Sequence, residues 1–130
     1  MFIAESKRLT HQGARKIMAT ALELAGQANI AIACAIVDAG GHVILIERMD
    51  GGRFHTVHSC TTKAVCAASN RRPTTAKGAA GPERWTAMEG GVPVLVDREC
   101  IGGVGVSGGD WETDLRIAKM AVESIGAKWE

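Results

Sequence analysis

The sequence predicts a single α+β domain, residues 1–130, in which helices pack on one antiparallel sheet. Its length suits one domain, since domains most often contain roughly 100–150 residues. Two pairs of short apolar segments are each joined by a connection too short for a parallel crossover, which needs about a dozen residues or more. Apolar residues at helical spacing stand before, between and after these pairs.

The first helix is predicted between Thr10 and Gly26. Thr10 is a suitable N-cap, and Gly26 marks the end of the pattern. Between them, apolar residues recur at helical spacing at Ala14, Ile17, Met18, Ala21, Leu24 and Ala25. A hairpin follows, with strands at residues 30–37 and 42–48 and a glycine-containing turn between them, so these two strands must be antiparallel.

Small residues leave one face of two predicted strands almost bare. Ala31, Ala33 and Ala35 alternate along the first strand, and Gly103 and Gly105 alternate along the last. Such faces let another structure approach the backbone closely. We expect either a packed helix on this face or, alternatively, a ligand or a neighbouring subunit.

The middle of the chain contains a second helix and a long irregular stretch. The helix is predicted over residues 54–68, after a turn at residues 50–52. Residues 69–91 are rich in glycine and proline, and they could add one helical turn near Glu83 and a fifth strand. So long a segment in a compact domain is often mobile or functional.

A second hairpin and a final helix complete the order α-β-β-α-β-β-α. The strands are residues 92–96 and 100–107, joined by a turn at residues 97–99. The final helix has acidic residues at its start, where the helix dipole is positive. Its apolar stripe is Trp111, Leu115, Ala118, Val122, Ile125 and Trp129. The order predicts a profilin-like fold, an antiparallel sheet of about five strands with helices packed on it.

Composition and charge exclude several classes of function. Lys and Arg total 15 against 14 acidic residues, a net charge of +1, so the basic excess of a nucleic-acid binder is missing. The longest apolar run, residues 30–37, is far shorter than the roughly 20 residues of a membrane helix. No secretory signal is recognisable. We therefore expect a cytoplasmic protein whose 4 cysteines stay reduced.

The glycine-rich segment before the final helix is a candidate anion site. Residues 103–108 read GVGVSG, but a dinucleotide fingerprint needs a second parallel strand ending in an acid about 20 residues on, and only one helix remains. Free N–H groups at Ser107, Gly108 and Gly109 would precede a helix N-terminus, which suits a carboxylate or phosphate. The alternative is a turn that only connects a strand to a helix.

Five polar side chains are further candidates. His55 and His58 stand three residues apart on the predicted second helix, so both could face one ligand. They could move a proton, a role for which Asp50 is also a candidate, or one of them could ligate haem iron. Arg48 suits a bidentate carboxylate contact, and Lys63 offers a second cation. For each, a surface side chain without a role is the alternative, and no metal site is predicted.

Several blocks of the sequence resemble the GlcG/HbpS-like family. The blocks are residues 35–51 (AIVDAGGHVILIERMDG), 63–64, 72–74, 90–93 and 101–109 (IGGVGVSGG), with Asp114 five residues on. Together they extend over residues 9–127. The resemblance implies a profilin-like fold, assembly into homo-oligomers, haem or related tetrapyrrole binding in some members, and an association with catabolic operons.

Two functions from different classes follow. The first is a homo-oligomer that binds haem or a related tetrapyrrole between subunits and is associated with a catabolic pathway. The second is an isomerase or tautomerase acting on a small carboxylate. In that enzyme, Arg48 and the turn at residues 107–109 would hold the carboxylate. His55, His58 or Asp50 would then move a proton. The expected partners are further copies of the chain and a small anionic ligand, with no nucleic acid and no membrane.

Overall fold

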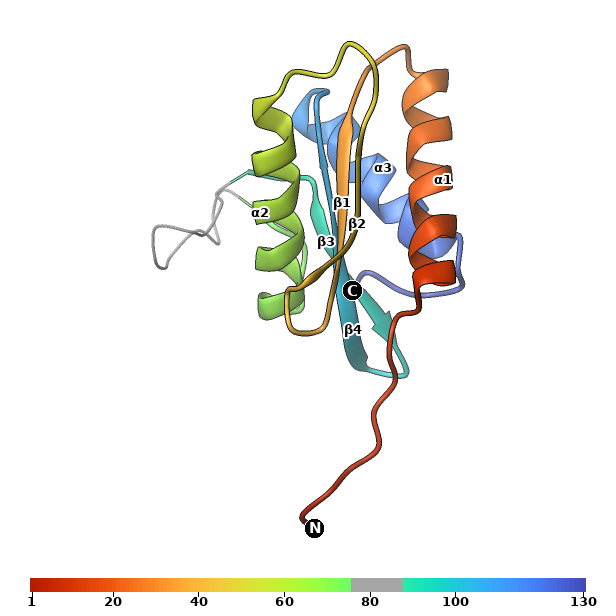
Figure 1. The fold of residues 1–130 in the computed structure, drawn as a ribbon, viewed down its shortest axis with the longest axis vertical. Helices are drawn as coiled ribbons and strands as arrows, with labels where there is room; N and C mark the ends of the chain where they lie inside the picture. Colours follow the sequence, from red (N-terminus) through yellow and green to blue (C-terminus); the bar gives the residue numbers. More distant parts are fainter. Residues whose placement is uncertain (76–87) are drawn as a thin grey trace.

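The computed structural model describes residues 1–75 and 88–130, and its elements follow the predicted order (Figure 1). They are α1 (His11–Gln27), β1 (Ala33–Asp38), β2 (Val43–Arg48), α2 (His55–Asn70), β3 (Gly91–Val96), β4 (Glu99–Ser107) and α3 (Trp111–Glu123). The strands form one antiparallel sheet in the order β2-β1-β4-β3. The α+β class and both hairpins are confirmed.

The described part of the chain contributes four strands to the sheet, and the fifth of the predicted sheet of about five strands is not confirmed. The fifth strand was expected within residues 69–91, and the helical turn near Glu83 also falls there. Residues 76–87 lie outside the described residues. The profilin-like arrangement stays a prediction. One isolated bridge, between Leu95 and Lys128, instead places the segment after α3 beside the outer edge of β3.

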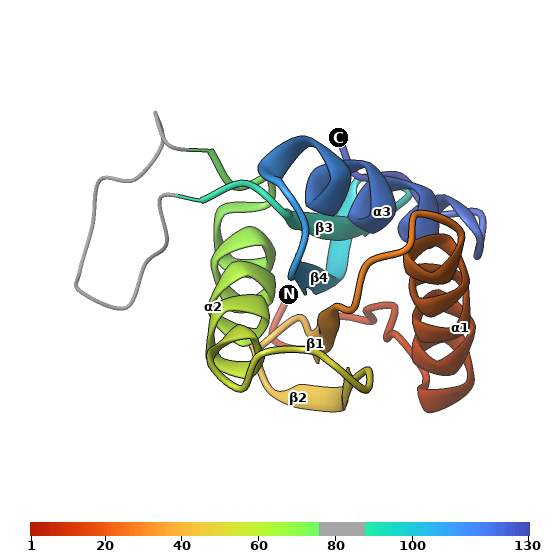
Figure 2. The same cartoon turned by 90° about the horizontal axis from the view of Figure 1, so that it is seen from above.

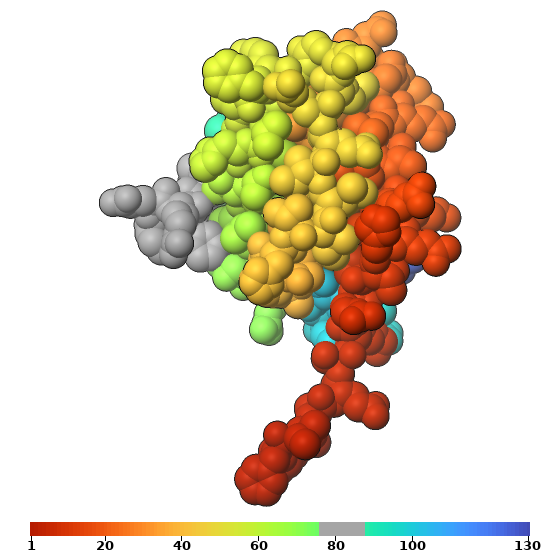
Figure 3. Space-filling view, viewed as in Figure 1, coloured from red at the N-terminus to blue at the C-terminus, as the bar shows by residue number. Residues whose placement is uncertain are grey.

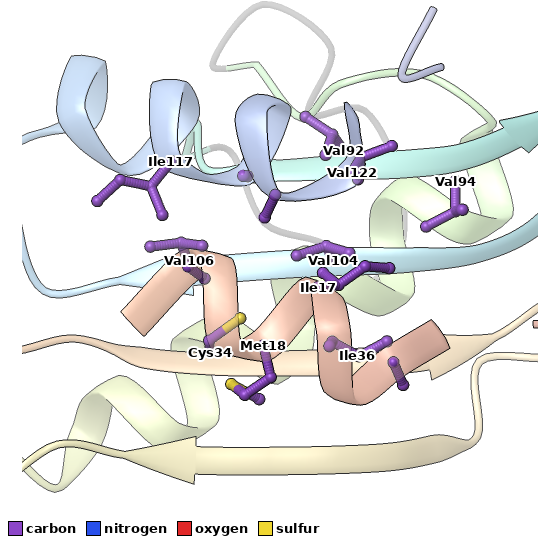
Figure 4. Close-up of a cluster of buried hydrophobic side chains, with 14 of the residues drawn as sticks. Ile17, Met18, Cys34, Ile36, Val92, Val94, Val104, Val106, Ile117 and Val122 are labelled. Carbon is purple, nitrogen blue, oxygen red and sulfur yellow. The ribbon is translucent and has the colours of Figure 1, made fainter. Parts of the chain in front are cut away.

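The sheet separates two layers of helices, as the view from above shows (Figure 2). α1 and α3 pack side by side on one face, and α2 covers the other face alone. Large apolar side chains fill the layer under α1 and α3 (Figure 4). They include Ile17, Met18, Ile36, Val92, Val94, Val104, Val106, Ile117 and Val122. This layer is the main hydrophobic core.

The nearly bare sheet face lies directly under α2. A Cβ atom added at Gly105 would overlap the carbonyl oxygen of Cys60, and one added at Gly103 would overlap the carbonyl oxygen of Ala64. The backbone of α2 therefore rests on the backbone of β4 with no side chain between them. Of the two alternatives for this face, the packed helix is correct.

The final helix is shorter than its predicted stripe, and its buried face is different. Trp111 is 54% exposed, and α3 ends at Glu123, so Ile125 and Trp129 lie beyond it. The buried residues of α3 are Asp114, Ile117, Ala118, Ala121 and Val122. The face that turns inward therefore includes a carboxylate, a feature that apolar spacing alone could not indicate. No helix in the described residues is both long enough and apolar enough to cross a membrane.

Candidate functional site

Four predicted site residues lie around the start of α2. Arg48 ends β2, His55 begins α2, and residues 49–54 connect the two elements. The connection is tight, because a Cβ atom at Gly52 would lie 3.0 Å from Cγ of Arg48. Arg48, Asp50, His55 and His58 are all exposed. The structure therefore brings the two imidazoles, one carboxylate and one guanidinium to the same end of the sheet.

Phe54 is the residue at this end that sequence reasoning did not single out. Its side chain is 81% exposed, and its ring meets the imidazole of His55 edge-on with the ring centroids 6.4 Å apart. A phenylalanine immediately before a helix start is commonly buried as an anchor, so its position in the sequence gave no functional signal. Its exposure leaves an apolar surface beside two histidines.

Arg48 and Ser107 share one face of the sheet but differ in accessibility. Both pair with Ala33, Arg48 from β2 and Ser107 from β4, so the three residues form one row across the sheet. Neighbouring strands are about 4.8 Å apart, which separates the Arg48 and Ser107 backbones by about 10 Å. Ser107 is buried and Arg48 is exposed. A ligand bound to the Arg48 guanidinium would reach Ser107 only if the atoms that bury Ser107 moved aside.

The glycine turn between β4 and α3 already binds an anion, the carboxylate of Asp114. The N–H group of Gly109 donates to Oδ1 of Asp114 over 2.8 Å. Gly108 has a φ of +142°, so a residue with a side chain would be strained there. The backbone amide that the sequence offers to a ligand is thus engaged within the chain, and a ligand carboxylate would have to compete with Asp114.

Lys63 forms a buried ion pair with the same carboxylate. The lysine is 1% exposed, its Nζ lies 3.5 Å from Oδ2 of Asp114, and it donates a hydrogen bond of 2.9 Å to the carbonyl of Val106. Burial lowers the pKa of Lys63 and raises the pKa of Asp114, because each charged form loses water, while attraction between the two charges opposes both shifts. Lys63 and Asp114 join α2 to α3 beside Val106, close to the end of β4.

The partnership of Lys63 and Asp114 had a signal in the sequence. Cys60, Ala64 and Ala67 form the face of α2 that packs on the sheet, and Lys63 adjoins that face. A lysine next to a buried helix face needs an acidic partner, since a buried charge is rarely left unpaired. Asp114, one turn into the final helix, is that partner.

The side chains at the start of α2 suit haem better than a free metal ion. Residues 1–75 and 88–130 contain no cluster of three or more His, Cys, Asp or Glu side chains that could hold a metal ion. Haem iron needs only an axial ligand from the protein, commonly a histidine, because the porphyrin supplies the equatorial ligands. His55 or His58 can provide that ligand, Phe54 offers an apolar surface, and Arg48 can pair with a propionate.

Comparisons with known sequences identify relatives along most of the chain. Residues 9–123 match the family model described as haem degrading protein HbpS-like. Protein GlcG of Escherichia coli K12 is 35% identical over 113 residues, which cover 76% of this chain and 81% of GlcG. An uncharacterized 15.0 kDa protein of Citrobacter freundii, from the dhaT-dhaS intergenic region, is 32% identical over 124 residues, or 85% of this chain and 87% of that protein.

Solved structures share the fold. ORFY of Klebsiella pneumoniae superimposes with a TM-score of 0.87 at 27% identity and covers 97% of both chains. The structure of a PduOC:heme complex has a TM-score of 0.87 at 26% identity, covering 95% of this chain and 99% of the other. A double mutant of HbpS from Streptomyces reticuli has a TM-score of 0.87 at 27% identity, covering 95% of this chain and 90% of the other.

Proposed function

The chain belongs to the HbpS-like family, and from this premise we propose that it is a homo-oligomer that binds haem or a related tetrapyrrole at the start of α2. The observation that carries the proposal is the exposed ring of Phe54 beside the exposed imidazoles of His55 and His58. The family description names haem, and one structural neighbour is described as a heme complex.

Each residue around this site has a separate task in the proposal. An imidazole of His55 or His58 would hold the iron, since histidine is a common protein ligand of haem. Phe54 would cover part of the apolar surface of the macrocycle. Arg48 would bind a propionate through a charge-assisted hydrogen bond. Because the site lies on the outer surface, one subunit covers only part of a porphyrin, and a second copy of the chain would cover the rest.

Haemin titration tests the proposed site. The parent protein should shift and sharpen the Soret band, and His55→Ala or His58→Ala should alter the spectrum because an axial ligand is lost. Phe54→Ala should keep the spectrum but weaken binding by about 0.5–1.5 kcal/mol, the contribution of one aromatic contact. His11→Ala, which removes an exposed imidazole at the start of α1, is the matched control. Identical spectra in the parent and both α2 variants would contradict the choice of ligands.

Assembly into a homo-oligomer is the second part of the proposal, and exposed apolar side chains support it. The first residues of the chain extend away from the body of the protein (Figure 3), and Met1, Phe2 and Ile3 there are almost fully exposed. Trp111 adds a half-exposed aromatic side chain at the start of α3. Large apolar side chains left in water commonly mark surfaces that another protein covers.

Light scattering tests this assembly. At micromolar concentration the mass should be a multiple of 13.7 kDa. The double variant Phe2→Ser, Ile3→Ser should shift the population toward smaller species, because it removes apolar area that a neighbouring copy would bury. A parent mass equal to that of one chain would contradict the proposal.

The isomerase hypothesis stays a prediction, and so does a role in a catabolic pathway. The hypothesis assigns the substrate carboxylate to Arg48 and the turn at residues 107–109. In the structure the Gly109 amide donates to Asp114, and Ser107 is buried. No feature of the described residues favours this reaction over binding alone.

A further inference from the structure

A groove of about 610 Å³ lies between the end of α2, the β3–β4 turn and the segment after α3. It is at the opposite end of α2 from His55, since Arg71, which immediately follows α2, lines it. Three of its lining side chains are cations, Arg71, Arg98 and Lys128. The groove is therefore separate from the proposed haem site.

The cations of the groove are not neutralised by ion pairs. In the described part of the chain, neither arginine nor Lys128 forms an ion pair with a carboxylate. Asp97, which also lines the groove, is paired with Lys7 outside this set, with 3.3 Å between Nζ and Oδ2. Glu130 is the other carboxylate of the lining. The lining thus carries three cations and two carboxylates, an excess of one positive charge, and one of the two carboxylates is shared with Lys7.

The backbone of the groove is in a conformation that favours glycine. Arg71 has a φ of 59° at the C-cap of α2, and Asp97 and Arg98 have φ values of 50° and 67° in the β3–β4 turn. Helix C-caps and two-residue hairpin turns with such angles commonly contain glycine, because a side chain is strained there. Of the four non-glycine residues with positive φ in the described residues, these three line the groove. Strained positions of this kind cluster at functional sites.

We propose that this groove binds a small dianion, either a phosphate monoester or a dicarboxylate. Arg71 and Arg98 provide planar forks that can each donate two parallel hydrogen bonds to one anionic group, and Lys128 adds a point charge. Two guanidinium groups can each hold one charged end or edge of a dianion, whereas a chloride ion has no pair of oxygen atoms to accept parallel hydrogen bonds. The proposal accounts for two arginines at positions where glycine would fit the backbone better.

Calorimetric titration with inorganic phosphate and with succinate tests the groove, with chloride as the monovalent reference. Saturable binding of phosphate alone would identify a phosphate group as the ligand chemistry, and binding of succinate alone a dicarboxylate. Binding of both would show recognition of two negative charges. Arg71→Gly and Arg98→Gly should each weaken binding about ten- to hundred-fold, because a hydrogen bond to a charged group is lost. Absence of saturable binding by either anion would overturn the proposal.

The same glycine variants carry a second readout, the melting temperature, which separates relief of strain from loss of the binding side chain. Each should raise the melting temperature by about 2–5 °C in anion-free buffer, because glycine relieves the left-handed strain. Asn29→Gly, at a φ of 57° away from the groove, is the matched control and should leave anion affinity unchanged. Higher stability together with lower affinity supports the proposal. Higher stability with unchanged affinity would overturn it.

Discussion

Gly105→Ala is expected to unfold the protein or prevent its accumulation. The added methyl group would overlap the carbonyl oxygen of Cys60, and no rotamer change can relieve this, because the backbone fixes the position of both the Cβ atom and the oxygen. Relief requires α2 to shift away from β4, which would also separate the other small residues under the helix. We expect a loss of more than about 4 kcal/mol, beyond the usual range of single substitutions. That is a large share of the roughly 5–15 kcal/mol available to a domain.

Chemical denaturation of purified protein measures this loss, and Gly26→Ala is the matched control. Gly26 lies near the end of α1, and a Cβ atom there would have no neighbour within 4 Å. The same substitution should therefore stabilise the helix by about 0.5–1 kcal/mol. If Gly105→Ala unfolded at the same denaturant concentration as the parent, the direct contact between the backbones of α2 and β4 would be wrong.

Asp114→Asn should cost about 3–5 kcal/mol, the loss that follows removal of one partner of a buried ion pair. The amide of asparagine can still accept the hydrogen bond from the N–H group of Gly109, so the variant removes the charge and keeps the contact. Lys63 then loses its ion-pair partner, which supplies the largest of the attractions that favour its charged form. Asp110→Asn is the control, because it removes an equal charge at the exposed N-cap of α3 and should leave the midpoint nearly unchanged.

The effect of Asp114→Asn should depend on pH through Lys63. Burial lowers the lysine pKa below 10.5, and loss of the carboxylate lowers that pKa further. Between the folded-state pKa and 10.5, the unfolded chain binds a proton that the folded variant has released. The free energy of unfolding of the variant therefore rises with pH in this window, by about 1.4 kcal/mol per unit. Its deficit relative to the parent should shrink at alkaline pH.

A double variant separates the buried charge from other causes. Lys63→Met in the Asp114→Asn background removes the buried cation that has lost its ion-pair partner, and it keeps a side chain of similar length. The double variant should be more stable than Asp114→Asn alone, because a neutral pair replaces an unpaired charge. A double variant less stable than both single variants, or a deficit of Asp114→Asn that does not change with pH, would show that the ion pair is not what the substitution disturbs.

Local chemistry made the elements of this fold predictable. Thr10 caps α1 as expected, accepting a hydrogen bond from the N–H group of Gly13. The two short turns fixed the antiparallel pairing of both hairpins, and the resemblance to the GlcG/HbpS-like family is confirmed along residues 9–123. In each case the signal lies within a few residues or in a continuous block, which a sequence displays directly.

The rest depended on contacts between distant segments. The bare face of β1 and β4 could be identified, but whether α2 or a ligand covered it depends on how the chain returns across the sheet. Lys63, next to the buried face of α2, indicated that some acidic partner was needed, but Asp114 looked like a favourable acid at a helix start, and only the tertiary fold identifies it as that partner. The outward position of Phe54 also depends on packing. The segment before α2 has no periodicity from which the orientation of this side chain could be predicted.

The direct contact between the backbones of α2 and β4 also affects the thermodynamics of binding at the start of this helix. A ligand that meets His55 and His58 meets a backbone that is already fixed, because α2 cannot slide or tilt without driving carbonyl oxygens into the sheet. Association then immobilises only side chains, at roughly 0.5–1.5 kcal/mol for each one ordered, with no loop to fold. The absence of large side chains on the sheet face under α2 thus lowers the entropic cost of binding a ligand on the exposed side of that helix.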